Sequence, residues 1–307
     1  MKRVVTLFIL LSLWAAAPAE AKLKVVTTTE DLTALAREVG GDRIEVSSIA
    51  KGYQDPHFVE AKPSYLLRLR GADLLIAVGL ELEVGWLPAL VQQSRNPRLL
   101  GKGSGYLDAS TGCDILERRA GPVSRAEGDV HPFGNPHYWL DPDNGGVMAA
   151  NIAGRLSELS PADAPYFRSR LEAFQKRLAE AARSWEDRMR PHRGVKVVTY
   201  HNSWPNFARR FGLEVVGFVE PRPGVPPSPS HTLKLIQAMK AQGVRVILVE
   251  PYFDPQTPNA VSREAGAKVV VLCPSVGGAE GVKDYFRLFE HNIALLEAVF
   301  RETGGAQ

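Results

Sequence analysis

Residues 161–190 decide the architecture of this chain, and they read PADAPYFRSRLEAFQKRLAEAARSWEDRMR. Their apolar side chains recur at intervals of three or four: Phe167, Leu171, Phe174, Leu178, Ala181, Ala182 and Trp185. This spacing is typical of an amphipathic helix, and 30 residues make a rod of about 45 Å. Because the stripe is broad and aromatic and lacks sustained heptads, we interpret the helix as a rigid strut between two lobes rather than a coiled-coil seam.

Strand and helix patterns alternate on both sides of this helix. Runs of branched apolar residues predict strands at 23–28, 44–49, 72–78, 195–200, 213–219, 244–249 and 268–272. Helical patterns separate them at 31–39, 63–70, 204–211, 232–241 and 258–265, and a last helix covers 283–300. Such alternation predicts parallel sheets with right-handed crossovers. We therefore expect an α/β fold with two parallel-sheet lobes, 22–159 and 192–307, joined by one long rigid helix over 160–191.

The N-terminus predicts export. Lys2 and Arg3 precede an apolar run over residues 4–14, and Ala19-Glu20-Ala21 then supplies a small-residue cleavage site. This pattern is typical of a secretory signal peptide over residues 1–21. The run is shorter than the roughly 20 apolar residues of a membrane span, and no cysteine at the cleavage point could carry a lipid. We expect a periplasmic protein.

Composition narrows the class of partner. The chain has 37 basic and 34 acidic side chains, and 45% of its residues are hydrophobic. Because no basic stripe is present, we expect no nucleic-acid partner. About 286 residues follow the leader, which is enough for two domains. Two cysteines, Cys113 and Cys273, are too few for a disulfide scaffold, and whether they pair with each other stays open here.

Three histidines carry the functional signal, each beside a proline or at a strand end. They lie in Asp55-Pro56-His57, in Asn135-Pro136-His137-Tyr138-Trp139-Leu140-Asp141-Pro142 and in Val198-Thr199-Tyr200-His201. The intervals of 80 and 64 residues exclude a local zinc finger, whose ligands come in close pairs. If the three imidazoles meet, the fold brings distant loops together, which indicates metal capture in a preorganised cleft.

The expected topology places several of these side chains at one edge. In open parallel sheets, ligands bind beyond the carboxyl ends of the strands. His201, Glu250 and Cys273 follow three predicted strands, and His57 lies in the loop after a fourth. We therefore expect them to face the groove between the lobes.

The same stretches resemble signatures of the zinc and manganese solute-binding proteins of ABC transporters. The resemblance rests on residues 55–64, 135–142, 201–204 with 211–213, 227–230 and 249–251, and it extends over essentially all of the mature chain. It implies two α/β lobes joined by one helix, with His57, His137 and His201 as metal ligands. It also implies a carrier rather than an enzyme, with a permease in the inner membrane as partner. We expect a monomer.

The chain departs from that family where a fourth ligand is expected. The family commonly has an aspartate in a short turn after the last strand, whereas this chain has Cys273 in Leu272-Cys273-Pro274. A thiolate ligand there would suit zinc and argue against manganese. Alternatively, Cys273 is a small buried hydrophobe, and water or Glu250 completes the coordination. The family's long histidine-rich loop is also missing, which leaves His131 as an accessory candidate; His192, His231 and His291 look structural.

These observations predict a periplasmic zinc-binding protein that captures Zn²⁺ in the inter-lobe cleft and delivers it to an ABC-transporter permease. Three imidazoles with at most one further donor suit zinc, whereas manganese prefers more oxygen. A manganese carrier of the same family is the alternative. A zinc-dependent hydrolase would share the open three-histidine site, but the chain has no H-E-x-x-H motif, and Glu250 is its only plausible base. A haem or siderophore carrier would depend on tyrosine or arginine instead.

Overall fold

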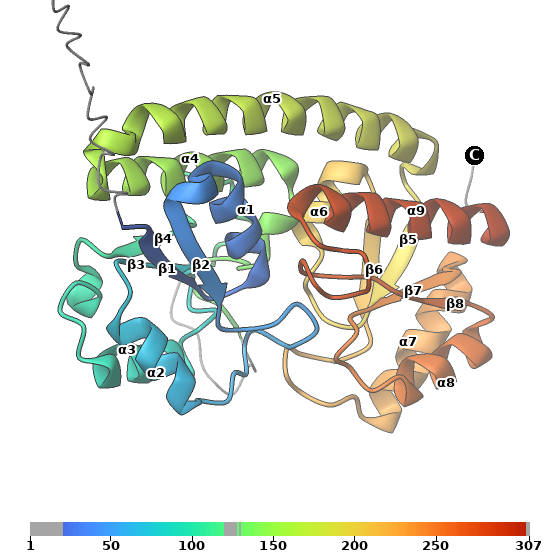
Figure 1. Ribbon diagram of the computed structural model, residues 1–307. Helices are drawn as coiled ribbons and strands as arrows, with labels where there is room; N and C mark the ends of the chain where they lie inside the picture. The colour runs from blue at the N-terminus through green and yellow to red at the C-terminus, as the bar shows by residue number, and fades with distance from the viewer. Residues whose placement is uncertain (1–20, 120–127, 129, 305–307) are drawn as a thin grey trace, which may run out of the picture.

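Two four-stranded parallel sheets form the framework of the protein, whose computed structural model describes residues 21–119, 128 and 130–304. The first sheet has the order β2-β1-β3-β4, with β1 (Leu23–Thr27), β2 (Ile44–Ser48), β3 (Leu74–Ala77) and β4 (Tyr106–Asp108). The second has the order β6-β5-β7-β8, with β5 (Lys196–Thr199), β6 (Glu214–Phe218), β7 (Val246–Val249) and β8 (Lys268–Val271). The two halves thus repeat one topology (Figure 1), as the alternating pattern predicted.

Helices cover both faces of each sheet, so central strands such as β7 are buried along their whole length. Around the first sheet lie α1 (Glu30–Gly40), α2 (Pro63–Arg70), α3 (Leu87–Ser94) and α4 (Pro142–Leu159). Around the second lie α6 (Pro205–Phe211), α7 (Pro229–Gln242), α8 (Gln256–Ala265) and α9 (Tyr285–Thr303). Each half is therefore a three-layer unit, with α2 and α3 or α7 and α8 on the face away from the long helix (Figure 1).

The long helix α5 (Ala164–Met189) runs along the top of both halves (Figure 1). Its buried stripe consists of Phe167, Phe174, Leu178, Ala182, Trp185 and Met189. The helix packs on α1 and α4 in the first half and on α9 in the second, where Trp185 stacks on Phe289 with 4.9 Å between ring centroids. The apolar stripe is thus buried inside one chain, as the strut interpretation predicted.

One contiguous core passes through both halves. It joins buried residues of β1, α1 and α4 to residues of β5, α6 and α9. Close packing of this kind transmits strain and resists large relative rotation of its parts. The lobe boundaries drawn from the sequence, 22–159 and 192–307, remain a prediction.

The loop after β8 is held firmly against the first half. Trp139 Nε1 donates to the Pro274 carbonyl at 2.8 Å, and Asp31 accepts hydrogen bonds from the Ser275 hydroxyl and from the Val276 N–H. Gly52 faces the same loop, where a Cβ would come within 1.9 Å of the Val276 carbonyl oxygen. Only glycine fits at this approach.

The sequence patterns gave no range for β4, α3 or α4, and the three residues of β4 are too few to show a period. The expected leader, residues 1–21, lies outside the described residues except for Ala21. Cys113 and Cys273 are both free and buried, so they do not form the disulfide that the sequence left open. Among the described helices, none is long and apolar enough to cross a bilayer.

Candidate metal centre

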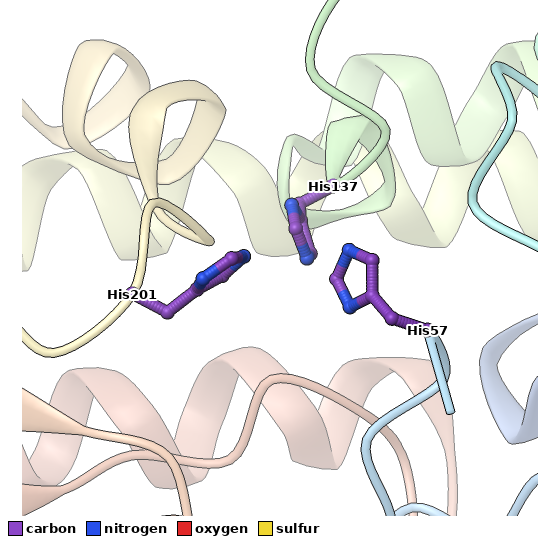
Figure 2. A group of neighbouring side chains, drawn as sticks. All are labelled: His57, His137 and His201. Atoms are coloured by element: carbon purple, nitrogen blue, oxygen red, sulfur yellow. The ribbon is translucent and has the colours of Figure 1, made fainter. Parts of the chain in front are cut away.

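His57, His137 and His201 meet where the two halves face each other, and one ligand nitrogen from each lies within 4.8 Å of the others. His57 is in the loop after β2, His137 precedes a 3₁₀ turn (Tyr138–Leu140) that leads into α4, and His201 lies two residues beyond β5. All three are buried. Figure 2 shows the three rings turned toward a common point. The predicted convergence of these histidines is therefore present.

The spacing of the three rings fits a tetrahedral ion. The centroid of His57 lies 5.3 Å from those of His137 and His201, and the latter two are 5.4 Å apart. For imidazoles bound through nitrogen at about 2.0–2.1 Å, tetrahedral geometry places ring centroids about 5.2 Å apart. Octahedral geometry with 90° between ligands would bring them to about 4.5 Å. The centroid spacings are therefore closer to the tetrahedral than to the octahedral value, with the ligand nitrogens within 4.8 Å of one another.

Two of the histidines are oriented by the residue two positions earlier. Asp55 Oδ1 accepts from the backbone N–H of His57 at 2.9 Å and bonds to its Nδ1 at 2.7 Å. Asn135 Oδ1 makes the same pair of bonds to His137, both at 3.0 Å. This is the local turn that Asx side chains favour. Because Nδ1 donates its hydrogen to the Asx oxygen, each ring presents its Nε2 lone pair to the site.

The amide of Asn135 is itself held in one orientation. Its Nδ2 donates to the Asn202 carbonyl at 2.9 Å and to Glu117 Oε2 at 3.1 Å, and Asn202 Nδ2 donates to the same Glu117 oxygen at 2.8 Å. Asn202 belongs to the second half and follows His201 directly. This network therefore connects the two histidine loops across the site.

His201 is oriented by Glu220, whose Oε1 is hydrogen-bonded to its Nδ1. Glu220 is buried, and it lies just beyond the carboxyl end of β6. Sequence reasoning missed this residue, although the rule applied to Glu250 and Cys273, a polar group following a parallel strand, points to it equally. It also missed the Asx–histidine pairing, which was visible as the repeat of Asp-Pro-His and Asn-Pro-His.

The pKa values of His137 and Asp55 both depart from their ordinary values at this centre. Burial, together with the neighbouring His57, His201 and His131, lowers the pKa of His137 well below its ordinary value. Burial by itself would raise the pKa of Asp55, but its hydrogen bonds to His57 and the charge of that ring outweigh this effect, so the Asp55 pKa lies below its ordinary value. A histidine must be neutral to bind a metal, and the lowered pKa of His137 favours that form.

The structure does not bring the two other candidates into this group. Cys273 packs in the core, its backbone N–H and C=O are both bonded to the Asn292 side chain, and burial raises the pKa of its thiol to about 11. Glu250 Oε1 accepts from Trp204 Nε1 at 3.0 Å, and burial raises the pKa of its carboxyl to about 7. Among the described residues, the group within 4.8 Å consists of the three histidines.

A cavity of about 730 Å³ lies beside the triad. His137, His201, Glu220 and Asn135 line it together with His131. His131 also lies next to His57, with 5.3 Å between ring centroids, but outside the group of three. The centre is therefore closed on three sides by imidazoles and open toward this cavity.

Comparison with known proteins identifies the family. Residues 25–299 match the family model described as ZnuA, zinc-uptake complex component A, periplasmic. The manganese ABC transporter substrate-binding lipoprotein PsaA of Streptococcus pneumoniae is 26% identical over 281 residues, which cover 89% of this chain and 87% of that protein. The zinc-binding protein AdcA of Streptococcus pyogenes is 25% identical over 290 residues, covering 91% of this chain and 56% of AdcA.

Solved structures agree in fold. A crystal structure of ZnuA superposes with a TM-score of 0.77 at 25% identity, covering 91% of this chain and 99% of that one. FpvC of Pseudomonas aeruginosa, solved with Mn²⁺, also gives 0.77 at 24% identity, covering 92% of this chain and all of FpvC. With a family match over nearly the whole described chain, the protein belongs to the ZnuA family of metal-binding components of ABC uptake transporters, which are extracytoplasmic solute-binding proteins and not enzymes.

Proposed function

We propose that this protein is a periplasmic zinc carrier, which binds Zn²⁺ through His57, His137 and His201 and delivers it to an ABC-transporter permease. The observation that supports this proposal best is the ring spacing of 5.3–5.4 Å, which matches tetrahedral rather than octahedral coordination. Zinc favours tetrahedral sites with nitrogen ligands, whereas manganese favours octahedral oxygen sites.

The donor set supports zinc over manganese. The names of the relatives do not agree on the metal, since PsaA is named as a manganese protein and AdcA as a zinc protein. In this chain the carboxylates of Asp55 and Glu220 contact the triad through hydrogen bonds to imidazole nitrogens. They therefore act as orienting groups, and the group of described ligand atoms within 4.8 Å is all nitrogen. A manganese carrier remains the alternative that the experiment below tests.

Capture in this centre needs little rearrangement. Each ring is already oriented by a hydrogen bond at its Nδ1, so the ion exchanges its water for three preorganised imidazoles. The core that passes through both halves disfavours a wide hinge opening. Release to the permease is then a movement of the histidine loops, which include the segment around His57.

A hydrolytic role does not fit the family, which is not enzymatic. Glu250, the candidate base in that alternative, is buried and hydrogen-bonded to Trp204. A general base must reach the water that it deprotonates, so the buried position of Glu250 does not suit that role.

Metal-competition binding tests the proposal. Metal-free protein is titrated with Zn²⁺ and with Mn²⁺ against a chelator of known affinity, and we expect one zinc per chain and a much weaker affinity for manganese. His137→Ala should reduce zinc affinity by more than the roughly 10- to 100-fold that loss of an orienting partner causes. His291→Ala on α9 is the matched control, since it removes a histidine far along the chain from the triad. Equal affinity for both metals, or unchanged zinc binding by His137→Ala, would refute the proposal.

A further inference from the structure

His131 has a ring nitrogen without a partner at the edge of the metal centre. Its Nε2 is buried and makes no hydrogen bond to any residue that the structure describes. The Nε2 atoms of His57 and His137 are in the same condition. A buried polar atom that lacks a partner costs about 1–3 kcal/mol, so its presence requires an explanation. For His57 and His137, the explanation is that Nε2 is the atom proposed to bind the metal ion.

The ring of His131 also shares features with the rings of the triad. The Leu80 backbone lies close enough to the His131 ring to affect its pKa, and the Nε2 of this ring is buried without a partner among the described residues. In this respect His131 resembles His57 and His137, whose Nε2 atoms are also buried and unpartnered. His131 lies 5.3 Å from His57 between ring centroids, the same spacing as within the triad.

The triad leaves one tetrahedral corner open, and among the described residues Cys273 and Glu250 lie outside the group of ligand atoms within 4.8 Å. The loop after β8 is clamped by Asp31 and Trp139, and Cys273 on that loop packs in the core. His131, by contrast, lines the cavity onto which His137 and His201 open.

We propose that His131 is the fourth protein ligand, so that the bound ion is held by four imidazoles. This inference rests on the proposed metal site at His57, His137 and His201. Because His131 lies outside the group within 4.8 Å, its ring moves toward His137 and His201 when the ion binds. A site of four nitrogens without a carboxylate is a stronger discriminator against manganese than three nitrogens with water.

X-ray absorption of the zinc-loaded full chain counts the ligands directly. We expect the outer-shell scattering of four imidazoles in the wild type, and of three imidazoles plus one oxygen in His131→Ala. Zinc affinity of this variant should fall about 10- to 100-fold. A residue that only positioned others could reduce affinity by the same factor, but it would leave the imidazole count unchanged. His291→Ala is the matched control and should keep four.

Cobalt substitution provides an independent readout. Four imidazoles leave no exchangeable position, so the visible spectrum of the Co²⁺ protein should not respond to added azide. In His131→Ala the open corner should bind azide and shift the spectrum. Three imidazoles plus oxygen in the wild type, or a zinc–sulfur distance of about 2.3 Å, would overturn the inference while leaving the carrier proposal intact. A wild-type chain that takes up no zinc would instead overturn the proposed function.

Discussion

Replacement of Glu220 by alanine tests whether the orientation of His201 determines metal affinity. Glu220 is buried and bonded to His201 Nδ1, and its Oε2 also accepts from the Gly224 N–H at 3.2 Å. Loss of such an outer partner typically weakens metal binding about 10- to 100-fold, which corresponds to about 1.4–2.7 kcal/mol. We expect Glu220→Ala to lose zinc affinity in this range and Glu220→Gln to lose less, because its amide oxygen still accepts a hydrogen bond.

The same change has a separate effect on stability. Without Glu220, the buried Nδ1 of His201 is left unpaired, which costs about 1–3 kcal/mol of unfolding free energy. Zinc affinity should be measured by chelator competition, and stability of the metal-free protein by urea denaturation. Glu214→Ala is the matched control, because Glu214 is exposed at the opposite end of the same strand. Wild-type zinc affinity in Glu220→Ala would refute the assignment of Glu220 as the orienting group.

Three further outcomes follow from other contacts. Asp55→Ala should weaken zinc binding about 10- to 100-fold, as measured by chelator competition. Asp55→Asn should bind zinc nearly as well as wild type, because Asn135 already performs this role for His137. Equal losses in the two variants would contradict the Asx-turn explanation. Burial raises the pKa of Asp31 to about 7, so the folded state retains a proton that the unfolded state releases near pH 4, and stability falls as pH rises from about 4 to 7. Asp31→Asn should therefore gain stability relative to wild type on going from pH 5 to pH 8, by a few kcal/mol at most (about 1.4 kcal/mol per pKa unit). Urea denaturation at the two pH values measures this difference, and the absence of a gain would disprove the explanation. Cys273→Ser should leave zinc affinity unchanged, and the cobalt protein should show no sulfur-to-metal charge-transfer band; a band that disappears in the variant would restore Cys273 as a ligand.

Much of the fold was predictable because the relevant signals are local. The apolar stripe of α5 has a helical period, and runs such as Val246–Val249 are apolar throughout because a parallel strand is covered on both faces. The ends of elements were less accurate: the helix expected at 232–241 begins three residues earlier, at Pro229, where the Ser228 side chain caps it. Short elements such as β4 were missed, because three residues carry no period.

The candidate site was predictable in part for a different reason. His57 and His137 lie in Asp-Pro-His and Asn-Pro-His, where the orienting residue and the ligand are two positions apart, so the local sequence encodes both the ring and its tautomer. His201 was placed by the rule that ligands bind beyond the carboxyl ends of parallel strands. The same rule also selected Cys273 and Glu250, which lie outside the group of three, because it identifies an edge of the sheet and not the direction in which a side chain points.

By itself, the sequence determined the two parallel-sheet halves, the strut between them and three histidines at one edge, since each depends on periodicity or on residues adjacent in the chain. Only the tertiary structure decided the partners that lie far apart. Glu220 reaches His201 from the neighbouring strand, and the loop after β8 is held against Asp31, 245 residues away along the chain. His131 likewise comes to lie beside His57. Such contacts arise from the packing of side chains between elements, which a linear pattern does not encode.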